Sequence, residues 1–332
     1  CELRRAEDVR RSHHGLNGFM PDIVTITLNP AVDLSTSVEK IIPVAKLRGT
    51  SQRRDPGGGG VNVARVIERL GGLDVLAIYA VGGAIGDMLR RLLDAEGVAS
   101  RTFPIAGETR EDFFVHETSS AQQYRFILPG PRLAEGEWSE CLRLIASMEP
   151  FPRFVVASGS LPAGVPDDFY AKVADIARRR GATMILDTSG PALAAAVAGG
   201  VNLIKPNLRE MRELAGAEPG DAHEWEIAAR RIIDQRQVEI VALTMGHLGA
   251  ALVTRDHVWR AQPLPVTPLS AVGAGDSFLG ALVWQLAAGA ELPNAFRYAM
   301  AAGAAAVLNP GTELCRPADV ERLARQVVME GS

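Results

Sequence analysis

The segment from Ser270 to Ser277 combines small residues with a carboxylate at the start of an apolar run. Gly273, Ala274 and Gly275 leave the backbone N–H groups open, and the helix predicted to follow has the positive end of its dipole there. Asp276, in the first turn, could act as a general base beside such an anion site. An ordinary helix start, with Asp276 balancing the dipole, is an equally good interpretation of these eight residues alone.

A run of four glycines, Gly57 to Gly60, precedes a second predicted helix over 61–71. The run matches neither the dinucleotide-binding fingerprint nor the phosphate loop of P-loop enzymes. Open backbone before a helix, with Asn62 able to donate and accept hydrogen bonds, favours the binding of a polyhydroxylated ligand. The alternative is a plain loop, although four glycines are a poor choice for one because each adds entropy to the unfolded chain.

A third candidate segment, KPNLRE (205–210), follows a predicted strand. Asn207 and Glu210 lie one helical turn apart, so both could reach a hydrated Mg²⁺ ion, which needs only one or two protein carboxylates when phosphates supply other ligands. An ordinary capping arrangement explains the same pair. Asp187 ends the preceding predicted strand and is a further candidate for water-mediated metal contact. Thr244-Met245-Gly246 is placed at another strand end, where it could meet a nucleotide phosphate.

Four basic residues, Lys46, Arg48, Arg110 and Arg125, fall on predicted short strands and could hold a phosphate group. Solvated surface charges are the alternative for each of them. The six histidines show neither metal-ligand spacing nor a nucleophile motif. The sequence therefore predicts phosphate chemistry that depends on carboxylates, glycines and basic residues.

The composition is that of a globular protein. Of the 332 residues, 47% are hydrophobic and 22% are charged, which excludes disorder, and the formal net charge of -4 gives no indication of nucleic-acid binding. No apolar run reaches the roughly 18 residues of a membrane-spanning helix. Three widely spaced cysteines favour a reducing, cytoplasmic location over a disulfide framework.

Alternating strand and helix patterns position these segments and predict a mostly parallel sheet with crossover helices. Residues 32–55 and 109–128 interrupt the alternation with short strands, so we expect one large α/β domain, 20–332, with a small β-sheet formed by these two insertions. Residues 1–19 are interpreted as an N-terminal extension, expected to be disordered, with Met20 as a natural start. The expected elements include a strand over 22–28, helices over 87–96 and 222–235, and a C-terminal helix over 317–330.

Taken together, these segments make the chain resemble the ribokinase-like, PfkB-type sugar kinases. The motifs that carry the resemblance, in chain order, are GGGGVNVAR (57–65), KPNLRE (205–210) and VGAGDS (272–277). The resemblance implies a three-layer ribokinase-like fold, in which helices flank a mostly parallel sheet and a small β-sheet forms a lid. It also implies a homodimer joined through the lids, so that a basic residue of one subunit reaches its neighbour's sugar phosphate.

Within that family, the chain most resembles the minor 6-phosphofructokinases of bacteria, which transfer phosphate from ATP to the C1 hydroxyl of fructose 6-phosphate. The shared segments are TLNPAVD (27–33), KLR (46–48), QYRF (123–126), SGSLP (158–162) and NPGT (309–312). The related 1-phosphofructokinases and tagatose-6-phosphate kinases are the alternative, but they commonly have lysine where this chain has Gly59 or Gly60. An inactive phosphosugar-binding regulator is the alternative of another class, and the presence of Asp276 argues against it.

The resemblance also implies roles for individual residues. Asp276 would be the base, Gly273, Ala274 and Gly275 the anion hole, and MgATP the phosphate donor. Two residues depart from the family pattern: Ala271, where a threonine is usual, and Glu313, where close relatives have a basic residue. The remaining implied contacts are Asp33, Gly58, Gly59 and Asn62 for sugar hydroxyls; Lys46, Arg48, Arg110 and Arg125 for the 6-phosphate; Lys205, Asn207, Glu210, Thr244 and Gly246 for MgATP, with Asp187 near the metal; and Ser270, Val272, Ala306, Asn309 and Gly311 for a K⁺ ion.

Overall fold

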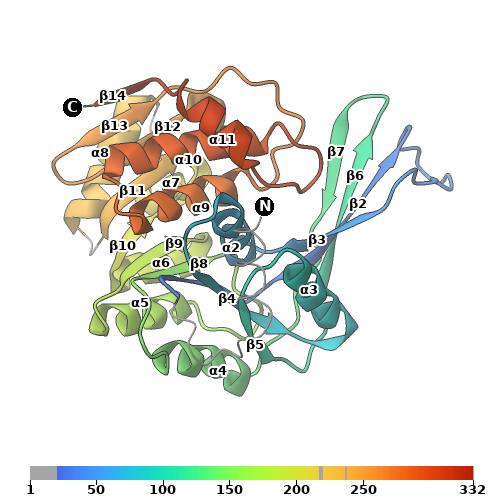
Figure 1. Ribbon diagram of the computed structural model, residues 1–332, viewed down its shortest axis with the longest axis horizontal. Helices are drawn as coiled ribbons and strands as arrows, with labels where there is room; N and C mark the ends of the chain where they lie inside the picture. The colour runs from blue at the N-terminus through green and yellow to red at the C-terminus, as the bar shows by residue number, and fades with distance from the viewer. Residues whose placement is uncertain (1–20, 217–219, 236–237, 332) are drawn as a thin grey trace, which may run out of the picture.

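A large sheet covered by helices on both faces forms the body of the protein, and a small second sheet stands beside it (Figure 1). The computed structural model describes residues 21–216, 220–235 and 238–331. The predicted mixed α/β architecture, with a mostly parallel central sheet and a separate small sheet, is confirmed. The predicted N-terminal extension over 1–19 lies outside the described residues.

The large sheet has ten strands, of which those from β5 across to β11 pair in parallel and those from β11 to β14 pair antiparallel. The buried strand predicted over 22–28 is β1. It lies between β8 and β4: the strands that directly follow it in the sequence, β4 and β5, lie on one side of it, and β8 and the later strands lie on the other. In spatial order the strands are β14 (Met329–Gly331), β13 (Val258–Ala261), β12 (Ala250–Val253), β11 (Val238–Thr244), β10 (Val201–Ile204), β9 (Thr183–Asp187), β8 (Phe154–Ser158), β1 (Ile23–Thr27), β4 (Val75–Val81) and β5 (Ser100–Pro104).

Each face of this sheet is closed by its own hydrophobic core, because successive strand residues point to opposite sides. Ile23 belongs to one core, and its neighbour Val24 belongs to the other. The first core is covered by α2 (Gly59–Leu70), α3 (Gly83–Ala95), α9 (Ala274–Ala287), α10 (Leu292–Ala306) and α11 (Pro317–Ala324). The second is covered by α4 (Glu135–Ala146), α5 (Phe169–Arg179), α6 (Gly190–Gly199), α7 (Leu208–Ala215) and α8 (Ala222–Gln235).

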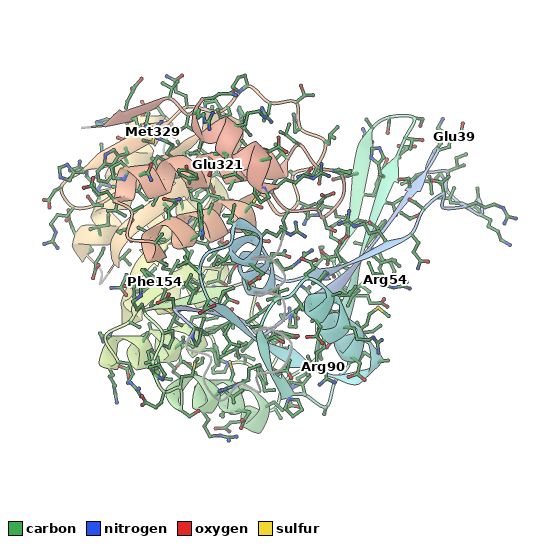
Figure 2. All side chains as sticks on the ribbon, in the orientation of Figure 1. Glu39, Arg54, Arg90, Phe154, Glu321 and Met329 are labelled. Atoms are coloured by element: carbon green, nitrogen blue, oxygen red, sulfur yellow. The ribbon has the colours of Figure 1, made fainter. Side chains whose placement is uncertain are left out.

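The small sheet projects away from the body (Figure 1) and has the strand order β3-β2-β6-β7. Its strands come from the two predicted insertions: β2 (Ala31–Val38) and β3 (Arg53–Gly57) from the first, and β6 (Arg110–Glu117) and β7 (Gln122–Phe126) from the second. Figure 2 shows Glu39 at the far end of this sheet and Arg54 nearer the body. Side chains near the body can therefore face the large sheet, whereas those at the far end cannot.

The structure differs from the sequence predictions at four places. The C-terminal helix was expected over 317–330, but α11 ends at Ala324 and the chain then forms β14 against β13. Helix α3 begins at Gly83 rather than at residue 87, and α4 was not predicted. Lys46 and Arg48 are not on strands, because the chain between β2 and β3 has no regular structure there. Among the described residues, no helix is long and apolar enough to cross a membrane.

Helices α2 and α9 pack closely because Gly280 has no side chain. A Cβ atom at this position would lie 2.6 Å from Val66 Cγ1 and 3.3 Å from the Val63 carbonyl oxygen of α2. Trp284, one turn further along α9, donates its indole N–H to the Gly71 carbonyl oxygen at 2.8 Å. This contact fixes the distance between the two helices whose first turns carry Asn62 and Asp276.

We expect Gly280→Ala to lower the stability of the protein by about 1–3 kcal/mol, because the helices must separate to admit the methyl group. Gly303→Ala in α10 is the matched control, since the added Cβ would have its nearest neighbour at 3.4 Å. Removing a helical glycine there should be neutral or stabilise by up to about 1 kcal/mol. Thermal unfolding of both variants measures the difference, and equal melting temperatures would contradict this account of the α2–α9 contact.

Candidate active site

A cavity of about 350 Å³ opens at the carboxyl ends of the central parallel strands, between the large sheet and the small sheet. Ligands bind at this edge of parallel α/β sheets, beside the point where the strand order reverses. Its lining comes from the ends of β8 and β9, the first turns of α2, α7 and α9, and the inner part of the small sheet. The predicted site residues in this lining are Asp33, Gly58, Gly59, Asn62, Arg110, Arg125, Asp187, Glu210, Val272, Gly273 and Asp276.

The four glycines are required by close approach to other segments. A Cβ at Gly57 would lie 2.3 Å from an Asp33 carboxylate oxygen, and one at Gly59 would lie 2.2 Å from Ser158 Oγ. At Gly60 it would lie 2.5 Å from the Ile26 carbonyl oxygen, and Gly58 has a φ of 108°, which side chains disfavour. Of this run, Gly58 and Gly59 line the cavity and present backbone to it.

Asp276 is joined to α2 by a hydrogen bond. Asn62 Nδ2 donates to Asp276 Oδ2 at 2.8 Å, although 214 residues separate them in the sequence. Burial raises the pKa of Asp276, while this hydrogen bond and the positive charge of Lys205 lower it. The carboxylate can therefore accept a proton from a hydroxyl group bound in the cavity, because burial favours the protonated form that results.

Lys205 lies beside the first turn of α9. Its Nζ is 3.1 Å from Asp187 Oδ2, and it would be 3.5 Å from a Cβ at Gly275. Burial is the largest single influence on Lys205 and opposes its charge, but the charge and hydrogen bond of Asp187, together with the charges of Asp276 and Glu210, outweigh burial and raise the pKa of the ammonium group. Burial likewise raises the pKa of Asp187 to about 6 against the influence of Lys205. A buried cation next to open backbone N–H groups is a suitable place for phosphate oxygens.

The first turn of α9 has the geometry of an anion site. Gly273 has a φ of 74°, and a Cβ there would be 2.7 Å from Leu314 Cδ2, so only glycine fits. Ala274 and Gly275 follow as the first helical residues, and their N–H groups have no partner within the helix. With the helix dipole behind them, these groups can stabilise negative charge.

Asn207 and Glu210 form the capping box that was the alternative to a metal role. The Asn207 side chain accepts from the Glu210 N–H at 3.0 Å, and Glu210 Oε2 accepts from the Asn207 N–H at 3.0 Å. Glu210 also lines the cavity, and its second carboxylate oxygen, Oε1, lies 3.5 Å from Arg209 Nη2. No cluster of three or more His, Cys, Asp or Glu side chains suited to a metal occurs in the described part of the chain. The donor set thus fits Mg²⁺, which retains waters and takes phosphate oxygens, better than a metal held by protein alone.

The small sheet contributes charged side chains to the cavity. Burial and the charge of Asp112 raise the pKa of Asp33 to about 7. Arg110 is 3.5 Å from Asp112 and donates to the Leu128 carbonyl oxygen at 3.1 Å, while its Nε is buried without a partner. Arg125 lies over the Phe114 ring at 5.5 Å and remains exposed. Both arginines therefore line the same cavity as the Asp33 carboxyl group.

Other predicted residues lie outside the cavity lining. Lys46 and Arg48 are exposed in the segment between β2 and β3 and do not line the cavity of their own chain. Thr244 ends β11 and bridges to Asn207, and its N–H donates to the Pro206 carbonyl oxygen at 3.0 Å. Gly246, with a φ of 60°, opens the short 3₁₀ helix η1 (Gly246–Leu248). Thr244 thus adjoins the segment that carries Lys205.

The segments of the predicted K⁺ site are adjacent. Ser270 Oγ donates to the Gly311 carbonyl oxygen at 2.7 Å, Val272 N–H donates to Ser270 Oγ at 3.2 Å, and Asn309 N–H donates to the Ala306 carbonyl oxygen at 3.0 Å. The unusual acid in this loop, Glu313, lies 3.3 Å from Arg53 in β3 and 2.8 Å from Arg316. Thr312 also donates to Asp55 in β3 at 2.9 Å, so this loop is tied to the small sheet.

Sequence reasoning missed several lining residues. Asp112 follows Arg110 by two positions on a strand, so both side chains lie on one face of the small sheet. This spacing could have identified Asp112 as a lining residue. Ser158 ends the buried strand β8, and Gly159 and Ser160 follow it, so their position at a strand end could also have identified them as lining residues. No sequence signal identified Phe114, Ile127, Thr188 and Ser189, which the fold brings to the same cavity.

Comparisons with known proteins identify the family of the chain. Residues 20–319 match the model of the pfkB family of carbohydrate kinases. The ATP-dependent 6-phosphofructokinase isozyme 2 of Mycobacterium tuberculosis is 45% identical over 302 residues, covering 91% of this chain and 88% of the relative. The crystal structures of Escherichia coli phosphofructokinase-2 with potassium and with fructose-6-phosphate have TM-scores of 0.88 and 0.86 and identities of 38% and 37%, each covering 92% of this chain and 99% of the other. With a family match across nine-tenths of its length and an enzyme-like site at the expected sheet edge, this chain belongs to the PfkB family of carbohydrate kinases.

Proposed function

We propose that this protein transfers the terminal phosphoryl group of ATP to the C1 hydroxyl of fructose 6-phosphate. The observation that carries the proposal is the half-buried Asp276 carboxylate at the start of α9, in a cavity also lined by Arg110 and Arg125. A base, an anion site and a pair of arginines are what a sugar-phosphate kinase requires in one place. The names of the relatives, which are 6-phosphofructokinases, support this choice of substrate.

The glycine run favours fructose 6-phosphate over the substrates of the related kinases. Those enzymes commonly have lysine where this chain has Gly59 or Gly60. A Cβ at Gly59 would meet Ser158, and one at Gly60 would meet the backbone of β1 at 2.5 Å. Neither position has room for a side chain, so the backbone itself approaches the sugar. Asp33, Gly58, Gly59 and Asn62 are the proposed contacts for its hydroxyl groups.

In the proposed reaction, the C1 oxygen attacks the terminal phosphorus atom of ATP while the bond to the ADP oxygen breaks. Asp276 accepts the hydroxyl proton, and the N–H groups of Gly273, Ala274 and Gly275 stabilise the charge on the transferring group. Mg²⁺, when bound, would neutralise phosphate charge near Glu210 and Asp187. Lys205, Asn207, Thr244 and Gly246 are the proposed contacts for the rest of MgATP.

The small sheet is proposed to act as a lid over the sugar. Arg110 and Arg125 would hold the 6-phosphate, since guanidinium groups bind phosphate with several hydrogen bonds at once. Lys46 and Arg48 do not line the cavity of their own chain, so their proposed role requires a second subunit in a homodimer joined through the lids. A cytoplasmic location fits the buried, free thiols of Cys141 and Cys315.

The segments around Ser270 and Gly311 are proposed to bind K⁺, in keeping with the potassium complex of the E. coli relative. The proposed ligands are Ser270, Val272, Ala306, Asn309 and Gly311. Their two segments are joined by the hydrogen bond from Ser270 to Gly311. A cation at this position would lie next to the segment that leads into the anion site of α9.

We expect Asp276→Asn to lower kcat for fructose 6-phosphate by about 10²- to 10⁴-fold, the usual contribution of a positioned general base. KM for both substrates should change far less, because Asn keeps the size and hydrogen bonding of the side chain. Asp319→Asn, in the first turn of α11 and outside the cavity lining, is the matched control at another helix start and should keep full activity. A coupled assay of ADP release measures both, and equal activity of Asp276→Asn and wild type would remove Asp276 as the base.

We expect Arg125→Ala to raise KM for the sugar phosphate by about tenfold or more while KM for ATP stays within about twofold, because only the sugar's phosphate would lose a charged partner. Arg54→Ala, an exposed arginine of the same sheet outside the cavity, is the control for general loss of positive charge. Arg48→Ala should raise the sugar-phosphate KM only if the protein is a dimer. A larger effect of Arg125→Ala on ATP than on sugar phosphate would place this arginine elsewhere.

A further inference from the structure

Arg65 is a fully buried arginine of α2 that the reaction described above does not use. It is the largest side chain with no exposed surface in the described part of the chain. Its Nε and Nη2 donate to Glu96 at 3.0 and 2.5 Å, and its Nη1 donates to the Pro56 carbonyl oxygen at 2.8 Å and to Asn62 Oδ1 at 3.0 Å. Burying a charge is costly, so a partnered arginine in this position calls for a reason beyond packing.

The contact with Asn62 decides which way that amide faces. A guanidinium group has only donors, so the atom of Asn62 that faces Arg65 must be the oxygen. The amide NH₂ group is then turned to the other side, where it donates to Asp276 Oδ2 at 2.8 Å. An amide that were free to rotate by half a turn would present its oxygen to Asp276 and would accept a hydrogen bond from the protonated carboxyl group.

We propose that Arg65 is a positioning residue for catalysis, which fixes the Asn62 amide so that it donates to the ionised Asp276 carboxylate and keeps this base ready to accept a proton. The inference rests on the proposed role of Asp276 as the general base. Glu96, at the end of α3, orients Arg65 through two hydrogen bonds. The chain of contacts thus runs from α3 through α2 to the first turn of α9.

The charges around Asp276 agree with this role. Burial raises the pKa of Asp276, and the groups that lower it are, in order, the Asn62 hydrogen bond, Lys205, Arg65 and Arg125. The acids that also face this region are Asp187 and Glu210, and their charges oppose ionisation of neighbouring carboxyl groups. The Asn62 hydrogen bond ranks above the charge of Arg65 among these influences, so Arg65 acts on the base mainly through Asn62 and less by its own charge.

Arg69 provides a matched control on the same helix. Its Nη2 donates to the same Glu96 carboxylate at 3.1 Å, but no hydrogen bond or ion pair joins Arg69 to Asn62 in the described part of the chain. Replacing Arg69 removes one positive charge and one bond to Glu96 while Arg65 keeps its contact with the amide. An effect that is specific to Arg65 then comes through Asn62, through its charge near Asp276 and Asp33, or through its contacts with Pro56 and Asp55, and the Asn62→Ala background separates the first of these from the others.

The test is a double-mutant cycle with Arg65→Met, Asn62→Ala and the combined variant, assayed by ADP release across pH 5–9 with fructose 6-phosphate and MgATP. We expect Arg65→Met to lower kcat by about tenfold or more and to move the acidic limb of the kcat profile to higher pH, because the carboxyl group then holds its proton more tightly. In the Asn62→Ala background, Arg65→Met should cost no more than about twofold further. Arg69→Met should stay within about twofold of wild type, with an unmoved profile.

Additive losses of kcat in the cycle would overturn the inference. A merely structural role of Arg65 would instead lower the melting temperature of Arg65→Met and leave the acidic limb of its kcat profile unmoved, and this result would also overturn the inference. If Arg65→Met does not fold, Glu96→Gln takes its place, since it loosens Arg65 without removing a positive charge, and an unchanged kcat profile would again count against the inference. An active wild type with an inactive Asp276→Asn and an unaffected Arg65→Met would refute this inference alone. An inactive wild type would refute the proposed function and this inference with it.

Discussion

The hydrogen bond from Asn62 to Asp276 is the interaction on which the site depends. It joins the first turns of α2 and α9, which carry the two glycine-containing segments of the chain, across a close helix contact that Gly280 permits. A buried carboxylate without a donor would take up a proton at neutral pH and could not serve as a base. The spacing of these two helices is therefore a chemical requirement as well as a packing one.

The site concentrates buried charge at the carboxyl edge of the sheet. Burial raises the pKa values of Asp33, Asp187 and Asp276, so each of these acids destabilises the free protein when it is ionised. The positive charges of Lys205 and Arg65 offset part of that cost at Asp276. Such an arrangement is expected where binding and chemistry, rather than stability, determine which residues are present.

Much of the site followed from local sequence patterns. The glycine run and the small residues before Asp276 could be identified because a strand, an open turn and a helix follow one another in the sequence, and the structure shows that each glycine of the run faces a close neighbour. The alternation of strands and helices likewise predicted the parallel sheet. These features depend on residues that are adjacent in the chain.

Contacts between distant segments could not be predicted in the same way. The pairing of Arg65 with Glu96 spans 31 residues, and nothing in the spacing indicates that one buried cation would meet that acid. The capping box at Asn207 and a magnesium site have the same sequence pattern, because both place an acid three residues after an asparagine. Lys46 and Arg48 were assigned to strands by composition, although the chain there forms none. In each case the tertiary environment, rather than the local sequence, decides the outcome.

The preference of the protein among ketohexose phosphates follows from the geometry of this site and can be measured. The values of kcat/KM for fructose 6-phosphate, fructose 1-phosphate and tagatose 6-phosphate should be determined side by side with MgATP. The account predicts the highest value for fructose 6-phosphate, because the open glycine backbone and the arginines of the small sheet suit a ketohexose with its phosphate at C6. A preference for fructose 1-phosphate would contradict the account, since the reacting hydroxyl and the bound phosphate would then be exchanged.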